Sequence, residues 1–125
     1  MNNANTELMD IELDGFNTGE AIGRLGGVDA YRFLINRYLS TIDEKLSELK
    51  ELFTDMNLEA TNKAVHQLHT LKGSALTLGA VSLAEIIANV EKKLPTATEN
   101  ERLKFINTLN ESFAMTSQIL KKYIA

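Results

Sequence analysis

The sequence predicts an all-α protein, folded as an antiparallel up-down-up-down four-helix bundle with a short extra N-terminal helix. Three observations favour this fold. Apolar residues recur at three-to-four spacing in four long segments, no segment alternates as a strand does, and the single proline stands between two of the segments. With 125 residues, 44 % of them hydrophobic, the chain is long enough for one domain with a core and too short for two.

Residues 1–14 are acidic and contain no lysine or arginine, so we expect a mobile tail before a domain that fills residues 15–125. The carboxylates of this segment are Glu7, Asp10, Glu12 and Asp14. Met9, Ile11 and Leu13 alternate with the acids and could rest on the bundle. We nevertheless interpret the segment as a tail.

Asn17, with Glu20 three residues later, has the form of a helix N-terminus and predicts a short helix that the glycine pair at 26–27 ends. From Val28 a long helix should run to about Phe53. Its apolar positions are Tyr31, Leu34, Ile35, Tyr38, Ile42, Leu46, Leu49 and Leu52 or Phe53.

A polar turn at 54–57 should reverse the chain into a helix that begins near Asn57 and that Gly79 closes. The core face of that helix carries Ala64, Leu68, Leu71, Ala75 and Leu78. Two further helices should follow, each opening on a capping-box pattern: Ser82 with Glu85, and Thr98 with Glu101. Pro95 should end the first of them. Their expected core positions are Leu83, Ile86, Ile87, Val90 and Leu94, then Leu103, Ile106, Leu109, Phe113, Leu120 and Tyr123 or Ile124.

Both histidines of the chain lie in the helix that precedes Gly79. His69 lies about 130° round that helix from the centre of its apolar face, and His66 and Gly73 lie further round. We therefore expect an exposed imidazole. Lys72 and Gly73 share its face one turn later, and Leu76 follows at i+7. Because glycine in an exposed helix costs about 1 kcal/mol relative to alanine, Gly73 indicates that another molecule approaches the helix beside His69.

An exposed neutral imidazole is a nucleophile at physiological pH, and phosphorus is a suitable electrophile for it. A phosphoryl group on His69 would add negative charge, which Lys72 can offset as a flexible point charge. On position alone, His69 would be a surface histidine with no function. Its combination with Lys72, Gly73 and Gly79 favours a phosphoacceptor.

The pattern His-x-Leu-Lys-Gly, followed by small and apolar residues up to a glycine, resembles the histidine phosphotransfer (HPt) domains of two-component phosphorelays. The residues that meet this pattern are His69, Leu71, Lys72, Gly73, Ser74 and Gly79. The resemblance extends from about Gly15 to the C-terminus and implies the same helical bundle.

The resemblance implies that His69 carries a phosphoryl group between the aspartates of receiver domains. The implied partners are response-regulator receiver domains and a hybrid sensor histidine kinase. The receiver would supply Mg²⁺ and most catalytic groups, so this chain would need no cofactor and no kinase activity of its own. Glu91, where the family often has Gln or Glu on the next helix, could orient the imidazole or could be solvated. His66, Leu76 and Thr77 are expected at the partner interface, and His66 could be a second acceptor.

Two other functions stay open: an adaptor bundle that binds a receiver without phosphorylation, and, more weakly, a metal-binding bundle that uses His66 and His69. Di-iron bundles need Glu-x-x-His on two helices, but the residues three before these histidines are Lys63 and His66. The adaptor differs from the carrier in one respect, that replacing His69 by Gln would leave its activity intact.

The composition of the chain argues against several other classes of protein. The net charge of −4, without a basic cluster, argues against nucleic-acid binding. No apolar run is long enough to span a membrane, and the first residues lack the parts of a signal peptide, so we expect a cytoplasmic monomer without membrane contact. Absence of cysteine excludes disulfides and thiolate metal sites.

Overall fold

The computed structural model describes residues 16–122, and in that range it contains helices and no strand. A short helix α2 (Thr18–Leu25) precedes four longer helices. These are α3 (Val28–Thr54), α4 (Leu58–Thr77), α5 (Val81–Lys93) and α6 (Glu99–Lys121), with a 3-10 turn (Leu94–Thr96) between α5 and α6. The prediction of an all-α protein is confirmed for the described residues. The expected tail, 1–14, and the expected core positions Tyr123 and Ile124 lie outside them.

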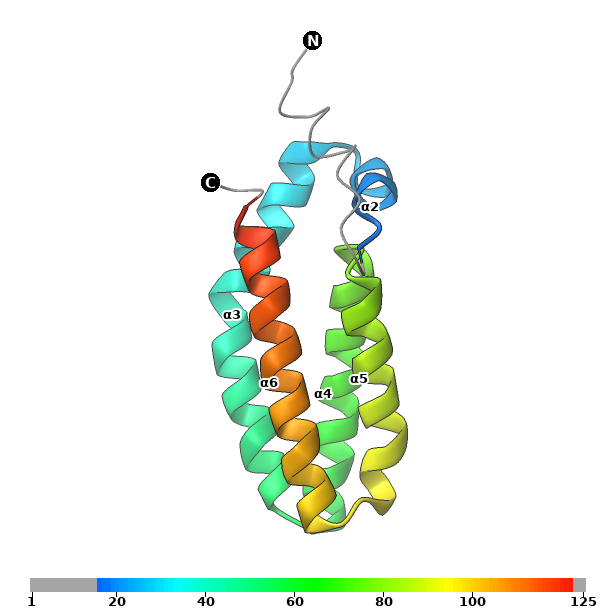
Figure 1. The fold of residues 1–125 in the computed structure, drawn as a ribbon, viewed down its shortest axis with the longest axis vertical. Coiled ribbons are helices and arrows are strands. Elements are labelled where there is room, and N and C mark those ends of the chain that lie inside the picture. The colour runs from blue at the N-terminus through cyan, green and yellow to red at the C-terminus, as the bar shows by residue number, and fades with distance from the viewer. Residues whose placement is uncertain (1–15, 123–125) are drawn as a thin grey trace.

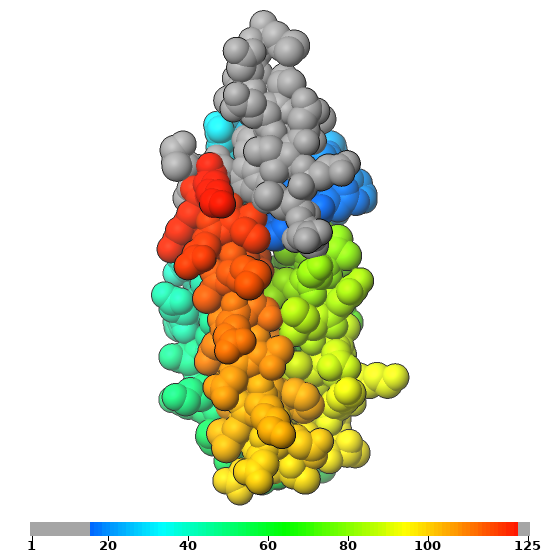
Figure 2. All heavy atoms as spheres, in the orientation of Figure 1, coloured from blue at the N-terminus to red at the C-terminus, as the bar shows by residue number. Residues whose placement is uncertain are grey.

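The four longer helices lie side by side along the long axis of the molecule, and α2 lies across one end (Figure 1). α4 packs against α3 and α5, and α6 packs against the same two helices. Figure 2 views the face of α6, with α3 and α5 on either side of it. Each long helix therefore has two neighbours, and the apolar faces meet in one core. No helix within 16–122 is both long and apolar enough to cross a membrane.

The connection between α4 and α5 depends on Gly79, which has a φ of +74° and closes α4 as expected. The backbone N–H of Asn17 donates to the carbonyl of Gly79 over 2.7 Å. A Cβ at position 79 would lie 2.6 Å from the carbonyl oxygen of Asn17. Glycine is therefore needed both for the left-handed backbone and for the close approach of the chain that enters α2.

The predicted capping box at Ser82 is wrong. α5 already begins at Val81, its N-cap is Ala80 without a side-chain cap, and Ser82 lies inside the first turn. The reason is the short connection: the Ala80 N–H donates back to Ala75 at the end of α4, while the Ala80 carbonyl accepts from Ala84. The chain thus turns directly from one helix into the next. The second predicted box is confirmed, because Thr98 and Glu101 cap α6 reciprocally.

The expectation that Leu103 lies in the core is also wrong, since Leu103 is 49 % exposed and its neighbour Arg102 is only 3 % exposed. The buried face of α6 includes Ile106 and Leu109. Four residues before Ile106, about one helical turn, this face contains position 102 and not 103. The guanidinium of Arg102 donates to the hydroxyl of Thr61 over 2.9 Å. It also reaches the carbonyls of Leu94, over 3.4 Å, and Asp55, over 3.5 Å. One buried cation therefore links α6 to three other segments at the end of the bundle away from α2.

Replacing Arg102 by Ala should lower the free energy of unfolding by about 2–3 kcal/mol, because it removes the donors to buried acceptors and leaves a cavity. Leu103→Ala, one residue away on the exposed side, is the matched control and should cost less than about 1 kcal/mol. Urea denaturation of both variants measures the difference. A larger loss for Leu103→Ala than for Arg102→Ala would contradict the assignment of position 102 to the core.

Candidate functional site

The local sequence of α4 fixes which way His69 faces. The side-chain oxygen of Asn57 caps the helix by accepting from the Ala60 N–H over 2.8 Å. The buried residues of α4 are Ala60, Thr61, Ala64, Leu68, Leu71 and Ala75, which form a single stripe. With that stripe in the core, His69 points outward and its side chain is 67 % exposed, as helical geometry predicted.

A carboxylate from the neighbouring helix lies against His69. Glu91, on α5, is 20 % exposed, and its Oε2 lies 3.4 Å from Nδ1 of His69. Its other oxygen, Oε1, lies 3.3 Å from Nζ of Lys72. Glu91 is therefore not a solvated residue of the outer surface. It bridges an imidazole and an ammonium that stand on the same face of α4.

The position of this carboxylate has a chemical consequence for the imidazole. An acceptor beside Nδ1 favours the tautomer in which Nδ1 holds the proton. Nε2 then keeps its lone pair, and it is the ring nitrogen remote from Glu91. An exposed imidazole held in this way is a nucleophile with a defined attacking atom.

The space beside His69 is open. A Cβ added at Gly73 would meet no atom within 4 Å, so packing among the described residues does not require glycine there. The cost of a glycine inside a helix, about 1 kcal/mol relative to alanine, is then not offset within this part of the chain. Leu76, one turn beyond Gly73, is exposed. Together they give α4 a smooth, partly apolar strip next to the imidazole.

The other residues predicted at the site lie near it without joining the contact to Glu91. His66 is exposed and lies at a shallow hollow that Glu59, Lys63 and Gln67 also line. The hydroxyl of Thr77 donates to the carbonyl of Gly73 within α4. Sequence reasoning therefore placed His66 and Thr77 on the correct helix, and the structure gives His66 no link to the carboxylate.

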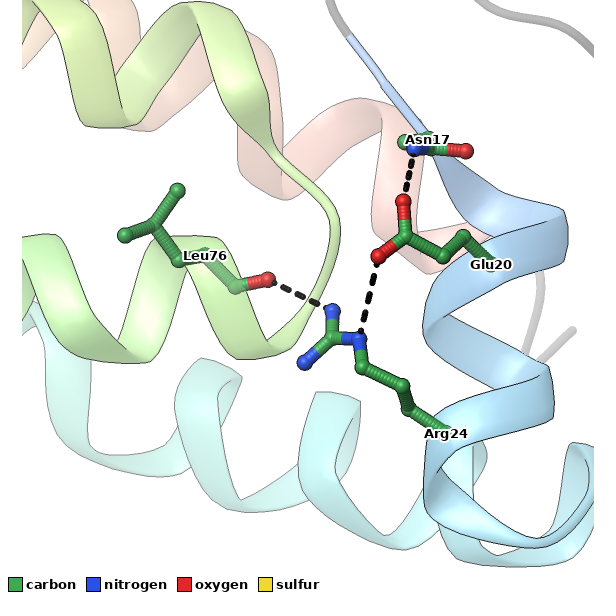
Figure 3. Close-up of polar contacts among 4 residues, drawn as sticks. All are labelled: Asn17, Glu20, Arg24 and Leu76. Atoms are coloured by element: carbon green, nitrogen blue, oxygen red, sulfur yellow. Dashed lines mark hydrogen bonds and ion pairs between the residues drawn. The ribbon is translucent and has the colours of Figure 1, made fainter.

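A residue from α2 reaches the end of this strip, and the sequence analysis did not identify it. Arg24 donates through Nη2 to the carbonyl of Leu76 over 3.1 Å, and its Nε lies 3.4 Å from Glu20 (Figure 3). The amide of Asn17 also donates to Glu20. Glu20 and Arg24 at i and i+4 were visible in the sequence as a helix pair, but their attachment to α4 depends on tertiary packing.

Within residues 16–122 there is no cluster of three or more His, Cys, Asp or Glu side chains that could hold a metal ion. Too few carboxylates lie near His66 and His69 to complete the usual coordination sphere of a metal ion. The described geometry therefore gives no support to the metal-binding alternative.

A sequence model described as the Hpt domain matches residues 34–117, which include α4, α5 and the contact between His69 and Glu91. No solved structure matched the chain. The matched range covers more than half of the 125 residues. The chain therefore belongs to the family of Hpt domains, which act as phosphocarrier modules in two-component phosphorelays.

Proposed function

We propose that His69 is the phosphoacceptor of this Hpt domain and carries a phosphoryl group between the aspartates of receiver domains. One observation supports this choice above all: the exposed imidazole of His69 has its Nδ1 beside the largely buried carboxylate of Glu91. His66 has no comparable contact within the described residues. The four longer helices, packed as a ring of neighbours, would form the antiparallel up-down-up-down bundle that holds this pair in place.

The transfer step follows from the position of Glu91. Nε2 of His69 attacks the phosphorus of an aspartyl phosphate, the P–N bond forms as the P–O bond breaks, and the aspartate leaves as a carboxylate. The ring becomes positively charged while Nδ1 keeps its proton. The carboxylate of Glu91, 3.4 Å from Nδ1, stabilises that charge. Passing the phosphoryl group to a second aspartate reverses these steps.

Lys72 and Gly73 have complementary roles in this proposal. The ammonium of Lys72 shares the Glu91 carboxylate and lies on the face of His69, where it offsets part of the negative charge of the phosphoryl group. Gly73 leaves room for the receiver, and His66, Leu76 and Thr77 lie on the surface that the receiver would contact. The receiver would bring Mg²⁺ and most of the catalytic groups, so this chain acts by positioning and electrostatics.

Single substitutions of His69 and His66 should show which of the two histidines accepts the phosphoryl group. His69→Gln should abolish transfer of labelled phosphoryl from a phosphorylated receiver domain, and His66→Gln should retain most of it. The label on the unmodified protein should be acid-labile and alkali-stable. Label that persists on His69→Gln would contradict the proposal, and receiver binding without any label on the unmodified protein would favour the adaptor alternative.

Removing the charge of Glu91 should slow transfer without unfolding the protein. Glu91→Gln keeps the shape of the side chain but cannot stabilise a positive ring as a carboxylate does, and we expect a loss of about tenfold in the transfer rate. Glu85→Gln, on the exposed surface of the same helix, is the matched control and should transfer at the normal rate. Equal rates for the two variants would remove Glu91 from the mechanism.

Substitution of Gly73 by a longer side chain should raise the free energy of unfolding but lower the rate of phosphoryl transfer. Gly73→Ala should raise the free energy of unfolding by up to about 1 kcal/mol, because the new methyl group meets open space and alanine favours the helix. Gly73→Gln should keep that stability and slow transfer by about tenfold or more, because the longer side chain blocks the receiver. Gly23 is the control, since it also lies inside a helix in open space. Gly23→Gln should leave transfer unchanged, and normal transfer by Gly73→Gln would show that access does not require glycine.

A further inference from the structure

A groove of about 350 Å³ lies between α3 and α4, beside the open space at Gly73. Its apolar lining comes from Leu34, Tyr38, Ile42, Leu71 and Leu78. Thr70 and Thr77 also line it, and they stand three residues before and four residues after Gly73. Residues at these spacings share one side of a helix. The groove is therefore continuous with the strip of α4 that lies next to the imidazole of His69.

The groove is positively charged, although the chain as a whole has a net charge of −4. Arg37 and Lys45, both on α3, line it, and no carboxylate among the described residues does so. Neither cation forms an ion pair with another residue in 16–122. Two cations without partners in one groove favour an acidic occupant.

The sequence of α3 explains why these cations have no acidic partner on their own helix. None of the residues three or four positions from Arg37 is acidic. The one acid at such a position from Lys45 is Glu48, and Glu48 accepts a hydrogen bond from the side-chain amide of Gln67 on α4 over 3.3 Å. Within the described part of the chain, both positive charges are thus left to another molecule.

The spacing of the two cations limits what that molecule can be. At about 1.5 Å per residue, Arg37 and Lys45 are separated by roughly 12 Å along α3. Over the same length the apolar side chains of Leu34, Tyr38 and Ile42 follow one another at intervals of one turn. A single small anion is too short to reach both cations. A protein surface with carboxylates on either side of an apolar patch can pair with both and cover the groove between them.

We propose that the groove between α3 and α4 selects the receiver, and that it binds an apolar patch of the receiver flanked by two carboxylates that pair with Arg37 and Lys45. This proposal rests on the proposed phosphotransfer function, because the receiver is the molecule that approaches Gly73 and His69. The two cations lie outside the contact between His69 and Glu91. They set the affinity for a receiver and leave the transfer step unchanged.

Reversing both charges in the full chain tests the proposal. The groove variant is Arg37→Glu with Lys45→Glu, and the measurement is transfer from increasing concentrations of a phosphorylated receiver domain that labels the unmodified chain. The receiver concentration that gives half-maximal transfer should rise about tenfold or more, while the maximal rate stays within about twofold. An unchanged half-maximal concentration, or a fall in the maximal rate alone, would overturn the proposal.

Two further variants separate the charges of the groove from other effects. Lys50→Glu with Lys104→Glu changes the net charge equally at exposed positions outside the groove, and it should transfer with the normal half-maximal concentration. Arg37→Lys with Lys45→Arg keeps both positive charges and should retain most of the affinity. A loss of affinity in the first variant as large as in the groove variant would show that net charge, not the groove, attracts the receiver.

The partner residues can be found by reversing charges on the receiver. Its exposed aspartates and glutamates are replaced one at a time by lysine, and each variant is assayed with the unmodified chain, with Arg37→Glu and with Lys45→Glu. At least one replacement should weaken binding to the unmodified chain and restore binding to one of the two single variants. Absence of any such compensating pair would overturn the pairing with carboxylates.

NMR spectra of this chain locate the receiver without any transfer. On addition of the unphosphorylated receiver domain, the amide signals of Thr41, Thr70 and Ser74 should shift more than that of Asn107 on α6, and the groove variant should lose these shifts. Shifts confined to the α5 side of Leu76 would overturn the proposal. Shifts that depend on the concentration of this chain alone would also overturn it, because they would show a second copy in the groove.

The two assays distinguish failure of this proposal from failure of the proposed function. Shifts in the groove without any label on His69 would count against phosphotransfer and leave receiver binding in the groove standing. Normal labelling of His69 in the groove variant at every receiver concentration would leave the phosphotransfer function standing and overturn the role of the groove.

Discussion

The contact between Glu91 and His69 is the interaction on which the account of this protein depends. A histidine on a helix surface is ordinarily free to rotate and to hold its proton on either nitrogen. Here the carboxylate of Glu91, largely buried between α4 and α5, lies beside both Nδ1 of His69 and the ammonium of Lys72. Burial of the carboxylate strengthens both attractions. The packing of two helices thereby gives an exposed side chain a preferred tautomer.

The remaining structure within residues 16–122 keeps α4 and α5 in register and leaves the outer face of α4 exposed among the described residues. At one end, the left-handed backbone of Gly79 allows the chain to enter α5 directly and lets Asn17 bind the same residue. At the other end, buried Arg102 joins α6 to α4 and to the turn after α5. Both interactions lie away from His69, so they fix the bundle at its ends, and the side chain of His69 stays exposed within the described residues.

Much of this could be predicted from the sequence, because helical periodicity, caps and the face of His69 are properties of local spacing. The errors occurred where tertiary packing overrode a local signal. Ser82 had a convincing capping pattern, but the tight connection after Gly79 moved the N-cap of α5 two residues earlier, to Ala80. Leu103 was taken for core because apolar side chains usually are, whereas Arg102 is buried there through three backbone and side-chain acceptors. The contact of Arg24 with Leu76 joins residues far apart in sequence, and no spacing rule reveals it.

The most direct test of the central claim is to locate the phosphoryl group on the ring. Long-range correlation of imidazole ¹⁵N and carbon-bound protons by NMR, recorded on the phosphorylated protein, distinguishes Nδ1 from Nε2 and His69 from His66. The account predicts that Nε2 of His69 is phosphorylated and that Nδ1 of the same ring holds a proton, next to Glu91. A phosphoryl group on Nδ1 of His69, or on either nitrogen of His66, would contradict it.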